Sequence, residues 1–190
     1  AEHTVLHLLY SRFFTKVLRD QGFVSFDEPF LALRHQGIIL GEDGHRMSKS
    51  RGNVVDPDEL VRAYGADTVR MFLAFMGPYD QGGPWNPAGI RGMSRFLERV
   101  FRLVSGAAKN DSDHPELERL LAKTAAKVGG DIGKLHFNTA VSALMIFVNA
   151  AEKNPEGFSA DGAKTLVKLI SPFAPHLADE LWREKLAMPG

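Results

Sequence analysis

The sequence predicts a mostly helical chain, in which a helix and one short strand precede a helical bundle that begins at about Asn86. From Asn86 onward, apolar residues recur with the 3.6-residue period of a helix almost without interruption. Ahead of the bundle, only residues 37–41 have the pattern of a strand, and one strand does not make a sheet. Residues 78–87 between the two regions are rich in proline and glycine, which is typical of a domain junction.

Composition narrows the class of protein. The chain has 190 residues, 44 % of them hydrophobic, which is enough for a sizeable core. It has no cysteine, which excludes a disulfide framework and a thiolate zinc site and suits a reducing cytoplasm, although histidines and carboxylates could still hold a metal. No apolar run reaches the roughly 20 residues of a membrane span, and the N-terminus lacks a signal-peptide pattern. Because 23 basic residues balance 23 acidic ones, any RNA contact must come from local clustering of charge.

The N-terminal segment is predicted to be a helix from Glu2 to Asp20, because apolar residues follow helical spacing and form a broad stripe. Gly22 is the expected stop. Gly37 and Gly41 then bound a short β-branched run, which predicts a strand. The stripe consists of Val5, Leu6, Leu8, Leu9, Phe13, Phe14, Val17 and Leu18.

Residues 44–53 form a short loop that combines positive charge, hydroxyls and glycines. Arginine offers a planar fork to phosphate oxygens, lysine offers a compact charge, and glycine permits unusual backbone conformations. These properties suit a polyphosphate ligand, although a solvated basic turn has the same composition. The cations are Arg46, Lys49 and Arg51, and the hydroxyls belong to Ser48 and Ser50.

Two short helices are predicted after this loop. Asp56 can cap the first, Pro57 suits its first turn, and Gly65 ends it. The second runs from Ala66 to Met76, in which Asp67 and Arg70 could be no more than a cap and a surface pair.

The helix that begins at Asn86-Pro87 is strongly amphipathic. At 100° per residue, four arginines fall within about 80° on the face opposite its apolar stripe. Such a face could neutralise RNA phosphates, or it could be an ordinary solvated face, since Glu98 lies among the arginines. The four residues are Arg91, Arg95, Arg99 and Arg102.

The remainder of the chain, from Asp113, has helical periodicity to its end. Gly129 and Gly130 should weaken one helix by about 1 kcal/mol each relative to alanine. Asn138 can cap the next helix. Pro172 and Pro175 are expected to separate the last two.

The order Arg46-Met47-Ser48-Lys49-Ser50 resembles the KMSKS loop of class I aminoacyl-tRNA synthetases, with Arg46 in place of the usual lysine. The runs 51–57 and 64–70 also resemble that class. The resemblance implies that residues 46–50 bind ATP and that Lys49 is catalytic, stabilising the departing pyrophosphate. It also implies a stem-contact fold around residues 46–85, where tRNA binding is relayed to the active site.

Residues 2–13 look like a stretch at the second half of the catalytic Rossmann domain in leucyl-tRNA synthetases. There Glu2 would accept a hydrogen bond from a ribose hydroxyl, and His3 and His7 would line the amino-acid pocket. The alternative is a pair of histidines on a helix surface. Residues 137–140 and 171–182 resemble the anticodon-binding helical bundle of the same enzymes. The resemblance thus implies a Rossmann remnant (1–45), the KMSKS loop with the stem-contact fold (46–85) and an incomplete bundle (86–190).

The resemblance implies that the parent enzyme activates leucine with ATP and Mg²⁺ and transfers it to tRNA(Leu). We expect this enzyme to be cytoplasmic, to hold no protein-bound metal and to bind no membrane. The other class I signature, His-x-Gly-His, is absent from these 190 residues. We therefore expect a piece of an enzyme that is inactive alone and needs the rest of the synthetase, in the same or another chain. Two alternatives stay open: a ligase for isoleucine, valine or methionine, and a non-catalytic helical module that binds tRNA or protein.

Overall fold

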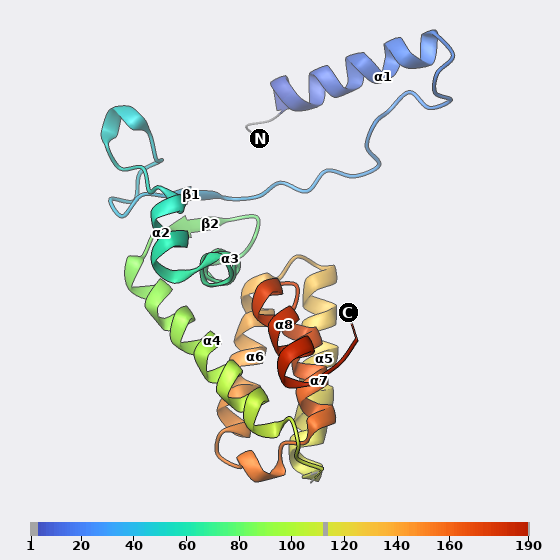
Figure 1. The fold of residues 1–190 in the computed structure, drawn as a ribbon. Helices are drawn as coiled ribbons and strands as arrows, with labels where there is room; N and C mark the ends of the chain where they lie inside the picture. Colours follow the sequence, from blue (N-terminus) through green and yellow to red (C-terminus); the bar gives the residue numbers. More distant parts are fainter. Residues whose placement is uncertain (1–3, 112–113, 190) are drawn as a thin grey trace. The chain divides into compact units, whose positions relative to one another are not determined.

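The computed structural model describes residues 4–111 and 114–189 (Figure 1). It separates into two compact units, one within residues 1–36 and the other within residues 37–190. No helix in the described ranges is both long and apolar enough to cross a membrane.

The first unit contains one turn of π-helix, η1 (Thr4–Leu9), that continues directly into α1 (Tyr10–Asp20). Gly22 has a φ of 78°, and the amides of Gly22 and Phe23 donate to the carbonyls of Arg19 and Leu18. This left-handed termination confirms the predicted stop. The predicted start at Glu2 lies outside the described residues.

Two strands pair in the second unit, where the sequence predicted one. β1 (Ile38–Leu40) runs parallel to β2 (Gly82–Pro84), with Ile38 opposite Gly82. Residues 78–87, which were predicted to be a domain junction, contain this second strand, because the segment returns to pair with β1. A Cβ at Gly82 would overlap the Ile38 carbonyl, so glycine permits the close approach of the two strands.

The short helices after the loop follow their local signals. α2 (Pro57–Tyr64) begins with Pro57, and the Asp56 carboxylate accepts a hydrogen bond from the Asp58 amide at 2.9 Å. Gly65, with a φ of 83°, separates α2 from α3 (Ala66–Phe75). The predicted cap, first turn and stop are confirmed.

The long helix α4 (Pro87–Ala107) begins where Asn86 accepts a hydrogen bond from the Ala88 amide. The helices that follow are α5 (Pro115–Gly133), α6 (Phe137–Ala151), η3 (Pro155–Gly157), α7 (Ala160–Ile170), α8 (Pro175–Glu180) and the π-helical turn η4 (Leu181–Lys185). Helix α5 runs through Gly129 and Gly130 without a break. The predicted cap at Asn138 is wrong, because α6 begins at Phe137 after His136, whose amide donates to the Asp131 carbonyl.

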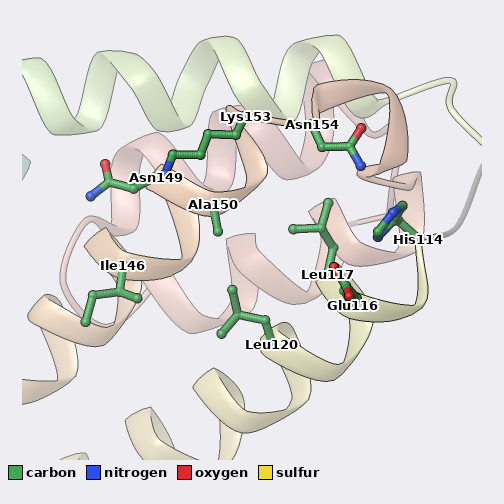
Figure 2. Close-up of a pocket in the computed structure, with 9 residues that line it drawn as sticks. All are labelled: His114, Glu116, Leu117, Leu120, Ile146, Asn149, Ala150, Lys153 and Asn154. Carbon is green, nitrogen blue, oxygen red and sulfur yellow. The ribbon is translucent and has the colours of Figure 1, made fainter.

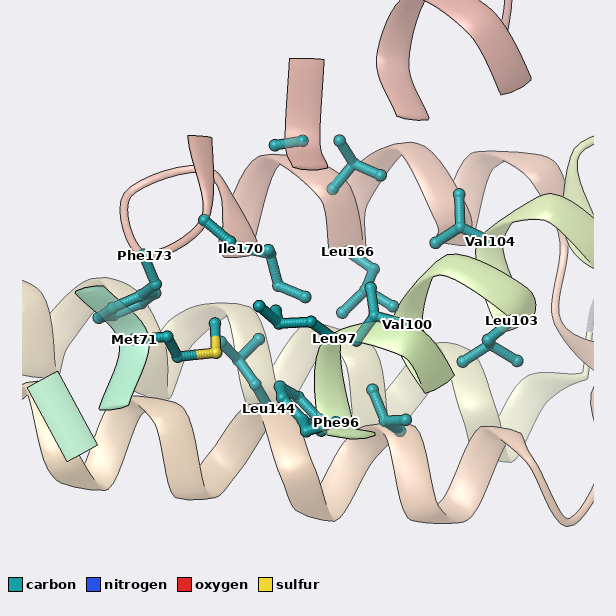
Figure 3. Packing of buried hydrophobic residues seen from close by; sticks show 14 of the residues in the cluster. Met71, Phe96, Leu97, Val100, Leu103, Val104, Leu144, Leu166, Ile170 and Phe173 are labelled. Atoms are coloured by element: carbon teal, nitrogen blue, oxygen red, sulfur yellow. The ribbon is translucent and has the colours of Figure 1, made fainter. Parts of the chain in front are cut away.

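One hydrophobic cluster holds the second unit together, and it extends from α3 through α4, α6, α7 and α8 (Figure 3). Met71 of α3 is fully buried in it together with apolar residues of the later helices. Helix α3, the second helix after the basic loop of residues 44–53, therefore shares a core with the bundle. Other members of the cluster are Phe96, Val100, Leu144, Leu166, Ile170 and Phe173.

Candidate functional site

The basic loop begins at a tight turn that follows β1. The Gly41 amide donates to the His45 carbonyl at 2.7 Å, and Leu40 forms an antiparallel bridge with Arg46. Gly44 completes this turn with a φ of 72°. The turn brings the chain back beside β1. The start of the segment from Arg46 to Ser50 is therefore held in place against that strand.

The centre of the loop is a short 3₁₀ turn, η2 (Lys49–Arg51). Ser48 caps it, because the Ser48 hydroxyl accepts a hydrogen bond from the Arg51 amide at 3.3 Å. The hydroxyls of Ser48 and Ser50 lie 3.1 Å apart. Met47 is half-buried against the hydrophobic cluster, whereas Lys49 and Ser50 are exposed. Within the described ranges the Lys49 ammonium forms no ion pair, so it is available to an anionic ligand.

Asn53 and Asp43 support the loop, although no role for either side chain was predicted from the sequence. The Asn53 side chain accepts from the Ser48 amide at 2.8 Å and donates to the Asp43 carboxylate at 3.1 and 3.2 Å. Hydrogen bonds from the His45 amide and from Asn53 hold the pKa of Asp43 below its ordinary value. Asn53 belongs to the run 51–57 that resembled the family, whereas Asp43 carried no sequence signal.

The proposed amino-acid pocket residues lie in the first unit. His7 is exposed on η1, and its ring contacts that of Phe30 with centroids 5.5 Å apart. Glu2 and His3 lie outside the described residues. The assignment of these three residues to a pocket stays a prediction.

The structure divides the four arginines of α4. Arg91 and Arg95 border one hollow of about 480 Å³, together with Tyr64 and Ser94. Arg102 borders a neighbouring hollow of about 440 Å³, which also has Tyr64 and Ser94 in its wall. Both hollows therefore lie against the end of α2, where an aromatic ring adjoins the basic face.

Arg99 does not join the other three arginines, because it binds α6. Its guanidinium donates to both carboxylate oxygens of Glu152 and to the side-chain oxygen of Asn149. The hydrogen bonds with Glu152 raise the pKa of Arg99 and lower that of Glu152. Arg99 thus has a structural role that the helical projection of α4 could not reveal.

Two side chains of α3 reach α8 and the segment just before it. Asp67 accepts hydrogen bonds from the Leu177 amide at 2.7 Å and from Nδ1 of His176 at 2.8 Å. Arg70 donates twice to the Pro172 carbonyl, at 3.1 and 3.0 Å. These residues are neither a cap nor a surface pair of their own helix. They connect the region after the basic loop to the end of the bundle.

A further hollow of about 480 Å³ lies between the start of α5 and the end of α6 (Figure 2). Leu117, Leu120 and Ile146 supply apolar wall, and Asn149 and Lys153 supply polar groups. No sequence motif pointed to this hollow. Among the described residues, no cluster of three or more histidines and carboxylates could hold a metal ion.

Two family models match the chain. The one described as "tRNA synthetases class I (I, L, M and V)" covers residues 12–83, and the one described as "Anticodon-binding domain of tRNA ligase" covers residues 115–189. The first includes the basic loop with α2 and α3, and the second includes α5 to α8.

Among curated proteins, the leucine–tRNA ligase of Bdellovibrio bacteriovorus is 53 % identical over 188 residues, which is 96 % of this chain and 24 % of that protein. The leucine–tRNA ligase of Herpetosiphon aurantiacus is 50 % identical over 190 residues, covering 95 % of this chain and 23 % of that protein. The chain therefore spans about a quarter of the length of these relatives.

Among solved structures, the ternary complex of Agrobacterium radiobacter K84 agnB2 LeuRS, tRNA and LeuAMS matches with a TM-score of 0.82 and 38 % identity, over 95 % of this chain and 26 % of that one. Mycobacterium tuberculosis methionyl-tRNA synthetase matches with a TM-score of 0.60 at 22 % identity, over 75 % of this chain and 36 % of that one, which is a likeness of fold. The loop, the two family models and the half-identical relatives agree: the chain belongs to the leucyl-tRNA synthetase family of class I aminoacyl-tRNA synthetases.

Proposed function

We propose that this chain is the part of a leucine–tRNA ligase that carries the pyrophosphate-stabilising loop and the tRNA-binding helices. The observation that carries the proposal is the exposed Lys49, held in a Ser48-capped turn without an ion pair in the described ranges, in a chain half identical to leucine–tRNA ligases. The complete enzyme would form leucyl-adenylate from leucine and ATP and transfer the leucyl group to tRNA(Leu). The lack of cysteine suits a cytoplasmic location.

In the first step the leucine carboxylate attacks the α-phosphorus of ATP, and the bond to the bridging oxygen of pyrophosphate breaks. Negative charge then grows on the leaving pyrophosphate. The Lys49 ammonium and the hydroxyls of Ser48 and Ser50 would meet that charge from the loop, with Arg46 close by in sequence. Because the loop can present these groups before reaction, their effect falls on the transition state. Mg²⁺ carried by ATP would neutralise further phosphate charge, since Mg²⁺ is commonly held by substrate phosphates with few protein ligands.

The tRNA contact is proposed for α4. Arg91, Arg95 and Arg102 border two hollows beside Tyr64, so phosphates could approach the arginines while a ribose or base contacts the ring. Arg99 is left out of this surface because it is bound to Glu152. The remaining parts of the synthetase, in the same or another chain, would supply the His-x-Gly-His half of the ATP site.

Two alternatives compete with this proposal. A ligase for isoleucine, valine or methionine shares the family model of residues 12–83, but the curated relatives at 50 to 53 % identity are leucine ligases. A non-catalytic module would not need an intact Met47-Ser48-Lys49-Ser50 turn. Comparing leucine with the other three amino acids in the pyrophosphate-exchange assay below separates the first alternative from the proposal.

The central test is Lys49→Ala in the complete ligase. Loss of one preorganised electrostatic contact typically costs about 3 kcal/mol, so leucine-dependent ATP–pyrophosphate exchange should fall about a hundredfold. The KM for leucine should change little. Lys109→Ala, which removes an exposed lysine just beyond α4, is the matched control and should keep the wild-type rate. An exchange rate for Lys49→Ala within about twofold of wild type would refute the assignment.

A further inference from the structure

We propose that Asn53 is a positioning residue for the catalytic loop, and that Asp43 sets the orientation of its amide. Asn53 touches neither ATP nor leucine in this proposal, and it acts through Ser48. The kinetic part of the proposal rests on the function proposed above, whereas the structural part does not.

The Asn53 side chain connects three points of the loop. Its oxygen accepts from the Ser48 amide at 2.8 Å, and its nitrogen donates to both oxygens of Asp43 and to the Arg46 carbonyl at 3.3 Å. A carboxylate can only accept hydrogen bonds, so Asp43 requires the NH₂ group of Asn53 to face it. The amide oxygen of Asn53 then faces Ser48. Asp43 therefore decides which end of the Asn53 amide reaches the loop.

A side chain at Gly41 would have to displace this bridge. A Cβ at Gly41 would lie 2.8 Å from Oδ1 of Asp43 and 2.9 Å from Nδ2 of Asn53. Gly41 is buried, and its amide holds the His45 carbonyl. The His45 amide in turn donates to Asp43 at 3.0 Å. The turn after β1 and the Asn53 bridge thus form one connected network of hydrogen bonds.

The bridge fixes the position of the backbone immediately before Lys49. Ser48 receives Asn53 at its amide and caps the Lys49–Arg51 turn with its hydroxyl. Its φ of −149° and ψ of 148° turn the chain from the extended segment into the 3₁₀ turn. If the Ser48 amide were released, this change of direction would no longer be held, and the Lys49 ammonium would sample many positions. Orientation of a catalytic group contributes strongly to rate, so the effect should appear in kcat.

A reciprocal exchange of the two side chains tests the bridge. In Asn53→Asp two carboxylates face each other and neither donates. In the double variant Asp43→Asn/Asn53→Asp the amide at position 43 can donate to the carboxylate at position 53, which can still accept from Ser48. The double variant gives up the bond to the Arg46 carbonyl and one of the two bonds between positions 43 and 53, because the position-43 oxygen that accepts from the His45 amide cannot donate. We expect Asn53→Asp to lower kcat for pyrophosphate exchange about tenfold in the complete ligase with an unchanged KM for leucine, and the double variant to recover to within about threefold.

A second measurement is independent of activity. Hydrogen exchange of the Ser48 amide, followed by NMR on this chain, should be about fivefold to tenfold faster in Asn53→Asp and near wild type in the double variant. Glu42→Gln is the matched control, because it removes a neighbouring exposed carboxylate that has no hydrogen bond among the described residues. Circular dichroism of each variant checks that the fold is kept.

Two outcomes overturn the proposal: Ser48 exchange and kcat unchanged in Asn53→Asp, or a double variant no better than Asn53→Asp. If wild-type ligase shows no leucine-dependent exchange, the proposed function fails instead. The Ser48 measurement then still decides whether the bridge exists.

Discussion

At the scale of single residues, Arg99 differs from the other three arginines of α4. Arg99 satisfies the 100° projection that groups it with Arg91, Arg95 and Arg102, yet it binds Glu152, which lies 53 positions further along the chain. Projection along one helix reports which residues share a face, and it cannot report what another helix places against that face. The charge of Arg99 is therefore neutralised within the protein, whereas Arg91 and Arg95 have no ion pair in the described ranges.

This difference predicts unequal effects on tRNA binding. Removing one cation that neutralises a phosphate should reduce the slope of log K against log salt by about 0.7 to 0.9. We expect Arg91→Ala and Arg95→Ala each to reduce the slope by about that amount, and Arg99→Ala to leave it unchanged. Filter binding of tRNA to the complete ligase over a salt series measures the slopes. Equal reductions in all three variants, or none in Arg91→Ala and Arg95→Ala, would contradict this division of the face.

At the scale of elements, the α5–α6 junction depends on Asp131. Its side chain is buried and accepts hydrogen bonds from Lys127 and, at 2.7 Å, from Thr139 of α6, while its carbonyl accepts from the His136 amide. Leu135 completes the turn with a φ of 61°. This arrangement makes His136, and not Asn138, the residue that precedes α6, which is why the capping signal failed.

The Asp131 contacts predict a pH-dependent stability. Burial opposes ionisation of Asp131, but the hydrogen bonds from Lys127 and Thr139 outweigh it and hold its pKa below 3.8. The stabilisation is therefore present above about pH 3.8 and disappears as pH falls through the lower folded-state pKa. Asp131→Asn should cost about 1.5 kcal/mol at neutral pH. Urea unfolding at pH 7 and at pH 3 measures the difference in free energy of unfolding between wild type and Asp131→Asn. A difference that does not become smaller at pH 3 would count against the role of the Asp131 carboxylate.

The contact between α3 and α8 gives a second prediction at this scale. Helix α8 has no side-chain cap of its own, and Asp67 accepts from the Leu177 amide in its first turn. Asp67→Ala should therefore destabilise the chain by about 1 kcal/mol, as removal of a helix cap does. His176→Ala is the control, because the His176 side chain is 80 % exposed and should contribute under about 0.5 kcal/mol. Urea midpoints compare the two variants. Equal destabilisation would show that the cap is not the stabilising contact.

At the scale of the whole molecule, the two units differ in how they bury apolar surface. The second unit has a continuous hydrophobic cluster, whereas among residues 5–36 only Thr15 is buried. Phe13 and Phe14 are 60 % and 63 % exposed. Exposed apolar area of this kind marks an interaction surface, and the remainder of the catalytic domain is the partner that we propose for it.

This exposure predicts that the chain binds apolar dyes. The double variant Phe13→Ser/Phe14→Ser should lower dye fluorescence and self-association, measured by titration and by light scattering. Ile146→Ser removes one exposed apolar residue from α6 and serves as the control, with little change expected. Unchanged dye binding in the double variant would mean that this stripe is not the surface that binds the dye.

The sequence by itself determined the features that arise within a few residues. Asp56-Pro57 and Asn86-Pro87 start helices, and Gly22 ends one, because caps and backbone conformation act over a single turn. The periodicity of the later segments determined that they are helical. The residue order of the basic loop was specific enough to indicate its family.

Only the tertiary structure decided the contacts between distant parts of the chain. The parallel pairing of Gly82 with Ile38, the binding of Arg99 by Glu152 and the capping of α8 by Asp67 join positions between 44 and 110 residues apart. Asn53 and Asp43 are only 10 residues apart, yet they meet because the Gly41–Arg46 turn folds back on its strand. A hydrogen bond needs both groups at one point in space, and local sequence specifies only the conformation around each group.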